Sequence, residues 1–183
     1  FTKRIQISAV STIISLAITA IVAYVFVHIS SIFGFGQSDA FILETGFLGS
    51  INLQGILLAG IIISVLGVLD DVTTAQTAAV EELYNTDSTL SVKNLYQKGL
   101  SIGREHIASL INTLILVYAG AALPLFLLLT LQNSQPLWIL MNSEFMAEEL
   151  VRALVGGIAL ILAVPLSTLL AAYIYASRSK DKS

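Results

Sequence analysis

The sequence predicts an all-α membrane protein with four transmembrane helices, and three observations support this. Of the 183 residues, 56% are hydrophobic and only 11% are charged, whereas soluble domains carry about 25% charged residues. Several stretches are apolar over the roughly 20 residues that a helix needs to cross a bilayer. The basic residues also gather on one side of a four-span arrangement. A water-soluble fold of this length could not cover so much apolar surface.

The four spans follow one another in a single transmembrane domain. They are predicted over residues of about 5–29, 53–82, 107–131 and 151–176. Between the second and third spans, Ser91 is a candidate N-cap for an amphipathic helix over about 91–104. We expect this helix to lie along the cytoplasmic membrane surface. The start at Phe1, directly before Thr-Lys-Arg, is typical of a fragment of a longer chain.

Lys and Arg residues predict the orientation of the spans. All but one of the nine lie near the two ends of the chain or between the second and third spans, so both ends are expected in the cytoplasm. The exception is Arg152, which Glu148 and Glu149 precede by four and three residues. This spacing predicts an ion pair at the outer membrane interface; a role at an outer gate is the alternative.

Small residues mark faces where membrane helices pack closely. The first span carries a continuous stripe of them: Ser8, Ser11, Thr12, Ser15 and Thr19. Similar groups stand at 119–122 in the third span and between Ala153 and Ser167 in the fourth. We interpret all three groups as helix packing without chemistry.

Two adjacent acids, Asp70 and Asp71, stand within the second span. Counted from Leu53 at ~1.5 Å per residue, Asp70 lies about 26 Å along the helix, just short of the inner boundary of an about 30 Å hydrocarbon core. The sequence fixes the depth of the two acids in the membrane only to within about two helical turns. Ionisable residues inside a membrane usually mark a transport pathway or proton relay. One predicted face of this span carries Asp70, Thr73, Thr74, Thr77 and Glu81, and the relay candidates of the span are Asp70, Asp71, Thr73, Thr74 and Thr77. The alternative is a helix that leaves the membrane with both acids in water.

The start of the third span supplies residues that could meet these acids. Histidine is a side chain that can relay protons, which makes His106 a candidate, and Arg104 can neutralise a carboxylate. The relay candidates here are His106, Asn112 and Thr113, and the ion-pair candidates of the whole chain are Arg104, Glu105, Glu148, Glu149 and Arg152. The alternative is that Arg104 and His106 are ordinary interfacial anchors.

Several classes of function are disfavoured. Cysteine is absent and only two histidines occur, and these fall on opposite sides of the predicted membrane. The sequence has no metalloprotease, serine-hydrolase or phosphate-loop motif. We therefore expect no enzyme, no catalytic residues, no cofactor and no metal site. The net charge of −3 and the lack of a large basic patch argue against nucleic acid.

Two segments carry a family resemblance: G-V-L-D-D-V-T-T-A-Q at 67–76 and G-R-E-H-I-A-S-L-I-N-T-L-I-L-V-Y-A-G-A-A-L-P-L at 103–125. They resemble the YibE/F-like family of bacterial membrane proteins. The resemblance implies an inner-membrane protein whose fuller form has an N-terminal helix and an extracytoplasmic region, and it implies no established activity.

A weaker resemblance is to one half of resistance–nodulation–division (RND) permeases and the SecD/SecF translocation motor. It implies the C-terminal part of an RND-like helix bundle, with Asp70 or Asp71 as proton carrier and Asn112 and Thr113 as its neighbours. The long extracytoplasmic domain of those proteins does not occur within these residues.

The favoured hypothesis is a proton- or ion-coupled transporter or an export-assisting component that uses the acids of the second span. The alternative is a non-catalytic membrane scaffold that binds a partner or anionic lipid through Lys93, Lys98 and Arg104. The expected partners are the lipid bilayer, a second copy or a paralogous membrane subunit, and the missing N-terminal region.

Overall fold

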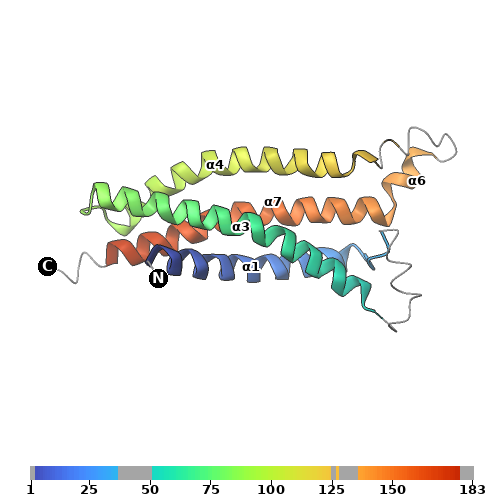
Figure 1. The fold of residues 1–183 in the computed structure, drawn as a ribbon, viewed down its shortest axis with the longest axis horizontal. Helices are drawn as coiled ribbons and strands as arrows, with labels where there is room; N and C mark the ends of the chain where they lie inside the picture. The colour runs from blue at the N-terminus through green and yellow to red at the C-terminus, as the bar shows by residue number, and fades with distance from the viewer. Residues whose placement is uncertain (1–2, 37–50, 125–126, 128–135, 178–183) are drawn as a thin grey trace.

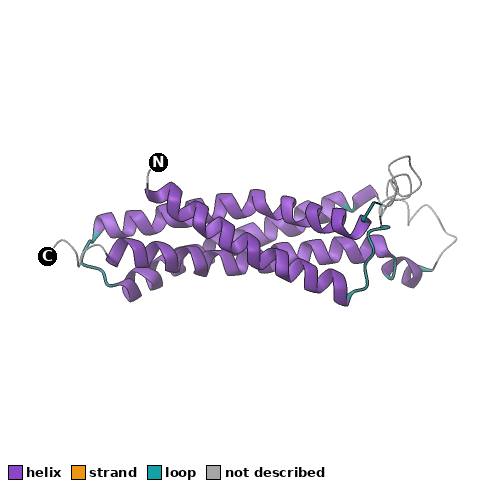
Figure 2. Ribbon diagram, turned by 90° about the horizontal axis from the view of Figure 1, so that it is seen from below, coloured by secondary structure: helices purple, strands orange, loops and turns teal. Residues whose placement is uncertain are grey.

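The computed structural model describes residues 3–36, 51–124, 127 and 136–177. Its elements are α1 (Lys3–Ile29), α3 (Leu53–Thr86), α4 (Val92–Ala121), α6 (Leu137–Met141) and α7 (Glu144–Ser177). Figure 2 shows helices and loops, and no strand, in the described part of the chain. The four longer helices run alongside one another, and each is long and apolar enough to cross a membrane. The predicted fold class is confirmed.

Helix α7 lies at the centre of the packing. It runs along α1, α3 and α4, while α3 also packs closely along α1 and makes a smaller contact with α4. Both ends of the chain lie at one end of the bundle, here called the terminal end (Figure 1). The opposite end, where α1 ends and α7 begins, is called the loop end.

The predicted stripe of small residues on α1 is a packing face. Ser8, Ser11, Thr12, Ser15 and Thr19 are all buried. Thr12 and Thr73 share a hydrogen bond of 2.6 Å between their hydroxyl oxygens, which joins α1 to α3. On α7, Gly156, Ala163 and Ser167 are buried as expected.

The stripe predicted near the end of the third span is not a packing face in this chain. Ala119, Gly120 and Ala121 are exposed, and only Ala122 is buried. The predicted third span runs on to about 131, and residues 125–126 and 128–131 of it lie outside the described residues. Small size alone therefore did not identify the face of α4 that packs.

The prediction of a separate surface helix over 91–104 is wrong, because this segment is the first half of α4. Ser91 caps the helix as expected, with its hydroxyl accepting from the backbone N–H of Asn94 at 3.3 Å. The helix then runs on without a break to Ala121. Its buried residues Leu95, Gly99 and Gly103 face the bundle. The apolar face of this amphipathic segment thus packs against protein and does not lie on a membrane surface.

A buried glutamine joins three helices at this point. The Gln76 side-chain amide of α3 donates to the backbone oxygen of Gly99 at 2.8 Å and to the Thr168 hydroxyl of α7 at 2.7 Å. A Cβ atom at Gly103 would lie 2.8 Å from Oε1 of Gln76 and would overlap Val164 of α7. Glycine is therefore required where α4 crosses α3 and α7. The spacing Gly99-x-x-x-Gly103 is typical of close helix contact.

The turn between α3 and α4 is held by a short polar contact. The backbone N–H and the hydroxyl of Thr89 donate to Oδ1 of Asp87 at 3.0 and 2.6 Å. These hydrogen bonds, the side-chain one first, lower the pKa of the Asp87 carboxyl below its usual value. An ionised group at this turn fits a terminal end that lies in water.

Candidate functional site

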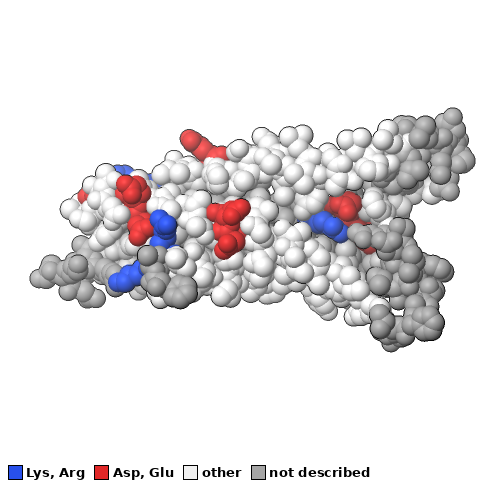
Figure 3. Space-filling view, in the orientation of Figure 1, with Lys and Arg blue, Asp and Glu red and all other residues white. Residues whose placement is uncertain are grey.

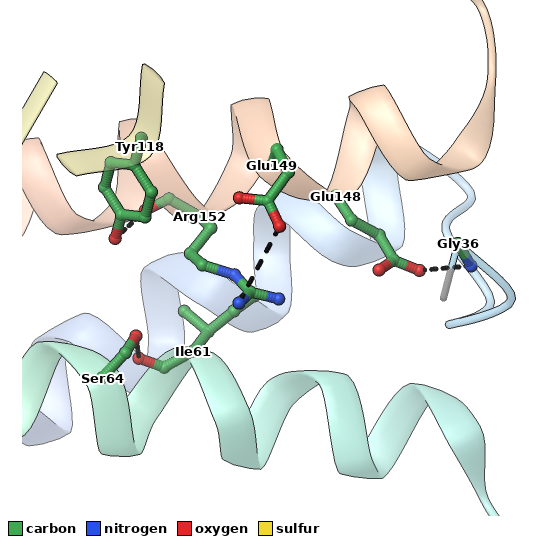
Figure 4. A network of polar contacts seen from close by, with 7 residues as sticks. All are labelled: Gly36, Ile61, Ser64, Tyr118, Glu148, Glu149 and Arg152. Atoms are coloured by element: carbon green, nitrogen blue, oxygen red, sulfur yellow. Dashed lines mark hydrogen bonds and ion pairs between the residues drawn. The ribbon is translucent and has the colours of Figure 1, made fainter. Parts of the chain in front are cut away.

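Charged groups form a layer at each end of the bundle. At the terminal end, Arg4 of α1 and Glu81 of α3 approach to 3.8 Å. Toward the loop end, Arg152 and Glu149 of α7 approach to 3.9 Å, and Arg152 reaches toward Ile61 of α3 (Figure 4). The part of α3 between Ile61 and Glu81 is about 30 Å long. This equals the thickness of a hydrocarbon core, so we take the two layers as its boundaries.

Asp70 and Asp71 lie midway between these layers. Each is about 14–17 Å along α3 from Ile61 on one side and from Glu81 on the other. Figure 3 shows a group of acidic side chains near mid-length over α3, separate from the charged groups at the two ends. With these boundaries, the acids lie at the deeper end of the two-turn range that the sequence left open. The first two turns of α3 then extend beyond the layer at Arg152, and Leu53 does not mark the membrane edge.

The relay candidates of α3 do not share one face. Asp70, Asp71 and Thr74 are exposed, whereas Thr73 and Thr77 are fully buried. Thr73 is held in its contact with Thr12, and the Thr77 hydroxyl makes no hydrogen bond within the described residues. Thr73 and Thr77 therefore belong to the packed interior, and the exposed polar surface consists of the two acids and Thr74.

The two acids point to different sides of α3. Asp70 precedes Thr73 by three residues and Glu81 by eleven, and both of these residues contact α1. Because residues three or four apart lie on one side of a helix, Asp70 lies beside α1. Asp71 lies on the opposite side of α3 from Leu69, which is fully buried. Its carboxylate therefore faces away from the helices that α3 packs on.

The candidates on α4 do not meet these acids within the chain. Arg104, Glu105, His106, Asn112 and Thr113 are all exposed. Within the described residues, no hydrogen bond or ion pair joins any of them to Asp70 or Asp71; Thr113 donates only to the backbone oxygen of Ser109, at 3.1 Å. Gly99 and Gly103, where α4 lies against Gln76 and Val80 of α3, are nearer the terminal end, and the five candidate side chains lie outside that contact.

The charged network near the loop end is partly as predicted. Glu149 pairs with Arg152 in the expected i,i+3 arrangement. Glu148 is buried and instead accepts from the backbone N–H of Gly36 at 2.9 Å (Figure 4). Of the two acids that could pair with Arg152, Glu149 does so among the described residues and Glu148 does not. The Tyr118 hydroxyl of α4 donates to the backbone oxygen of Arg152 at 3.5 Å, which ties α4 to this layer.

A backbone loop binds Glu144 at the start of α7, a contact that sequence reasoning missed. Oε1 of Glu144 accepts from the N–H groups of Phe33, Gly34 and Phe35 at 2.6, 2.7 and 3.2 Å. Gly34 has φ of 92°, and a Cβ there would lie 2.7 Å from the backbone oxygen of Leu53. The loop therefore needs glycine at this position. Since the loop and Glu144 are more than a hundred residues apart in sequence, no local pattern indicates the contact.

The described residues contain no group of three His, Asp or Glu side chains that could hold a metal ion. The exposed polar groups near the middle of α3 include the two carboxylates and the hydroxyl of Thr74. Carboxylates of this kind can take up and release a proton or a cation.

The YibE/F-like protein family matches residues 1–177, which is nearly the whole chain. The chain belongs to this family. In this YibE/F-like protein, the first segment that carries the resemblance lies in the middle of α3, and the second lies along α4 as far as Ala121. No curated protein and no solved structure matches the chain. The resemblance to RND permeases and SecD/SecF therefore stays a prediction.

Proposed function

We propose that this YibE/F-like protein is a proton- or ion-coupled transport component in which Asp70 and Asp71 bind and release the coupling proton or cation. The observation that carries the proposal is the position of the two carboxyl groups, midway between charged layers about 30 Å apart along α3. The role is not enzymatic. The expected location is the bacterial inner membrane, with the terminal end in the cytoplasm as the distribution of Lys and Arg predicts.

An ionised carboxylate at the centre of a bilayer is unfavourable by about 2.5–3.5 kcal/mol or more. Two adjacent carboxylates would also repel each other, and like charges at close range favour protonation of one of them. A proton on one acid removes the repulsion and the penalty for that acid, and the other acid keeps its own penalty until it is also protonated or paired. At mid-depth, such a proton can be exchanged with either side as water reaches the site from one end of the bundle or the other.

Because the acids are exposed within the chain, the proposed relay also needs a second protein surface that covers them. Within the chain, Asp71 faces away from the neighbouring helices, so another protein surface must cover it before it can bind a proton away from lipid. We therefore place the relay at an interface between subunits. Thr74 and the polar residues of α4, His106, Asn112 and Thr113, remain relay candidates on such an interface.

The proposal predicts selective labelling by dicyclohexylcarbodiimide, an apolar reagent that reacts with protonated carboxyl groups. In lipid vesicles at pH 7, we expect Asp70 or Asp71 to be modified, as located by mass spectrometry of the peptides. Glu82, an exposed acid of the same helix at the terminal end, is the internal control and should stay unmodified. The label should disappear in the double variant Asp70→Asn, Asp71→Asn.

The opposite pattern would contradict the proposal. If Glu82 and the two aspartates react equally, or if neither aspartate reacts at pH 5 or pH 7, no proton is held on these acids inside the membrane.

The scaffold function is the second candidate, and one observation favours it. Lys93, Lys98 and Arg104 are exposed on the first half of α4, and neither of the two ion pairs among the described residues includes them. They are free to contact anionic lipid or an acidic partner. Lys93→Glu with Lys98→Glu should then disrupt a complex or reduce binding to anionic vesicles, whereas Asp70→Asn and Asp71→Asn should leave both unchanged.

A further inference from the structure

We propose that two copies of this chain pair through the open face of α3 and α4, so that Asp71 of each copy meets His106 of the other. This inference deepens the proposed function, because it names the surface that covers the acids. It rests on three observations: the side on which each residue lies, the depth at which each lies, and the small residues around Asp71.

Asp71 and His106 open onto the same side of the bundle. Asp71 lies on the side of α3 turned away from the helices it packs on. His106 follows Gly103 by three residues and Gly99 by seven, and these glycines are the positions where α4 contacts Val80 and Gln76 of α3. His106 is therefore on the side of α4 nearest α3, while being exposed. Figure 1 shows α3 and α4 diverging toward the loop end, so this face is broad.

The two residues also lie at the same depth. Gly103 packs against Gln76, which sets the level of α4 against α3. His106 is three residues from Gly103 toward the loop end, and Asp71 is five residues from Gln76 in the same direction, so their levels differ by only about 3 Å. A second copy in the same orientation presents its His106 at the depth of Asp71.

The outward side of α3 is built for close approach of another helix. The residues around Asp71 on this side are small and mostly exposed: Gly60, Ser64, Gly67, Ala75 and Ala78. A Cβ atom added at Gly60 or Gly67 would meet nothing within 4 Å. In membranes, helix contacts form at small residues because they let the backbones come close. Among the described residues, none lies close to the stripe at Gly60 or Gly67.

A two-fold axis parallel to the helices, in front of the α3–α4 face, places α3 of one copy against α4 of the other, and the reverse contact is identical. Two-fold dimers of this type are the commonest symmetric assemblies. The contact pairs an acid with a group that is cationic when protonated, and one proton shared between Asp71 and His106 leaves the pair neutral. Arg104 and Glu105, which directly precede His106, are also exposed and carry opposite charges.

Cysteine cross-linking between differently tagged copies tests the pairing directly. The chain has no cysteine, so single substitutions report one position each. Gly67→Cys in one copy and Thr113→Cys in the other should give a strong mixed disulfide dimer in oxidised membranes, since both positions lie at nearly equal depth on the proposed face. Ala17→Cys is the matched control, because Ala17 is an exposed residue of α1 at the depth of Gly67; paired with Thr113→Cys it should give only background.

A charge swap adds a second readout. His106→Asp in the copy that carries Thr113→Cys should remove the mixed dimer, and Asp71→His in the copy that carries Gly67→Cys should restore it. Mixed dimer at the level of the Ala17 control would overturn the proposal. So would efficient cross-linking of Gly67→Cys with itself, which would mean that α3 packs on α3 of the other copy.

These outcomes are independent of the proposed function. Carbodiimide labelling of the aspartates without the mixed dimer would leave the relay in place and remove this interface. The mixed dimer without such labelling would keep the interface and remove the relay.

Discussion

Gly103→Val is expected to separate α4 from α3 and α7 at the point where the three helices meet. Any side chain at this position overlaps Val164 and approaches Oε1 of Gln76. Overpacking of this kind typically costs about 1–3 kcal/mol. Gln76 is also displaced from its bonds to Gly99 and Thr168, and a buried polar group left without a partner costs a further 1–3 kcal/mol or so. The midpoint of thermal unfolding in detergent should fall strongly.

Gly120→Val is the matched control for this change. It introduces the same side chain on the same helix, at a glycine where an added Cβ meets nothing within 4 Å. Its midpoint should stay close to that of the unmodified protein or rise slightly, because glycine is the poorer helix former by a few tenths of a kcal/mol or more. Equal losses in both variants would mean that the junction at Gln76 does not hold α4 in the bundle.

Asp70→Asn and Asp71→Asn are each expected to abolish proton movement while leaving the fold intact. Asparagine has nearly the shape of aspartate, but it cannot take up and release a proton. Both side chains are exposed within the chain, so neither change disturbs the buried contacts of α3. Proton entry into vesicles that contain the protein and a pH-sensitive dye, under an imposed pH gradient, measures the effect.

Glu82→Gln provides the comparison, since it removes one carboxylate from the same helix beyond the charged layer at Glu81. Proton movement in this variant should equal that of the unmodified protein, and unfolding midpoints should agree for all three variants. Undiminished proton movement in both aspartate variants would rule out the relay.

Much of the fold could be predicted from the sequence, because length and hydropathy reflect the thickness of the bilayer. The four spans, the packing stripe of α1 and the pair Glu149–Arg152 were predicted from residues close together in the chain. Each of these features depends on spacing within a single helix, which the sequence displays directly.

The rotation of each helix could not be predicted. In a membrane, the side that faces lipid and the side that faces another helix are both apolar, so hydropathy does not show which side packs. Thr73 and Asp71 are two residues apart, yet one is fully buried and the other exposed. The junction at Gln76 and the loop around Glu144 join distant segments, and neither was predicted, although the spacing of Gly99 and Gly103 is a signal that could have pointed to the first of them.

The central claim is that a proton is held on the acids of α3 inside the membrane, and infrared difference spectroscopy of the protein in lipid tests it most directly. A protonated carboxyl group has a C=O stretching band that an ionised one lacks. At pH 7, the account predicts such a band in the unmodified protein, weakened or lost in Asp70→Asn or Asp71→Asn and retained in Glu82→Gln. If this band is absent at pH 7 and the aspartates become protonated only in strongly acidic buffer, as carboxylates in water do, the acids are solvated and the account is contradicted.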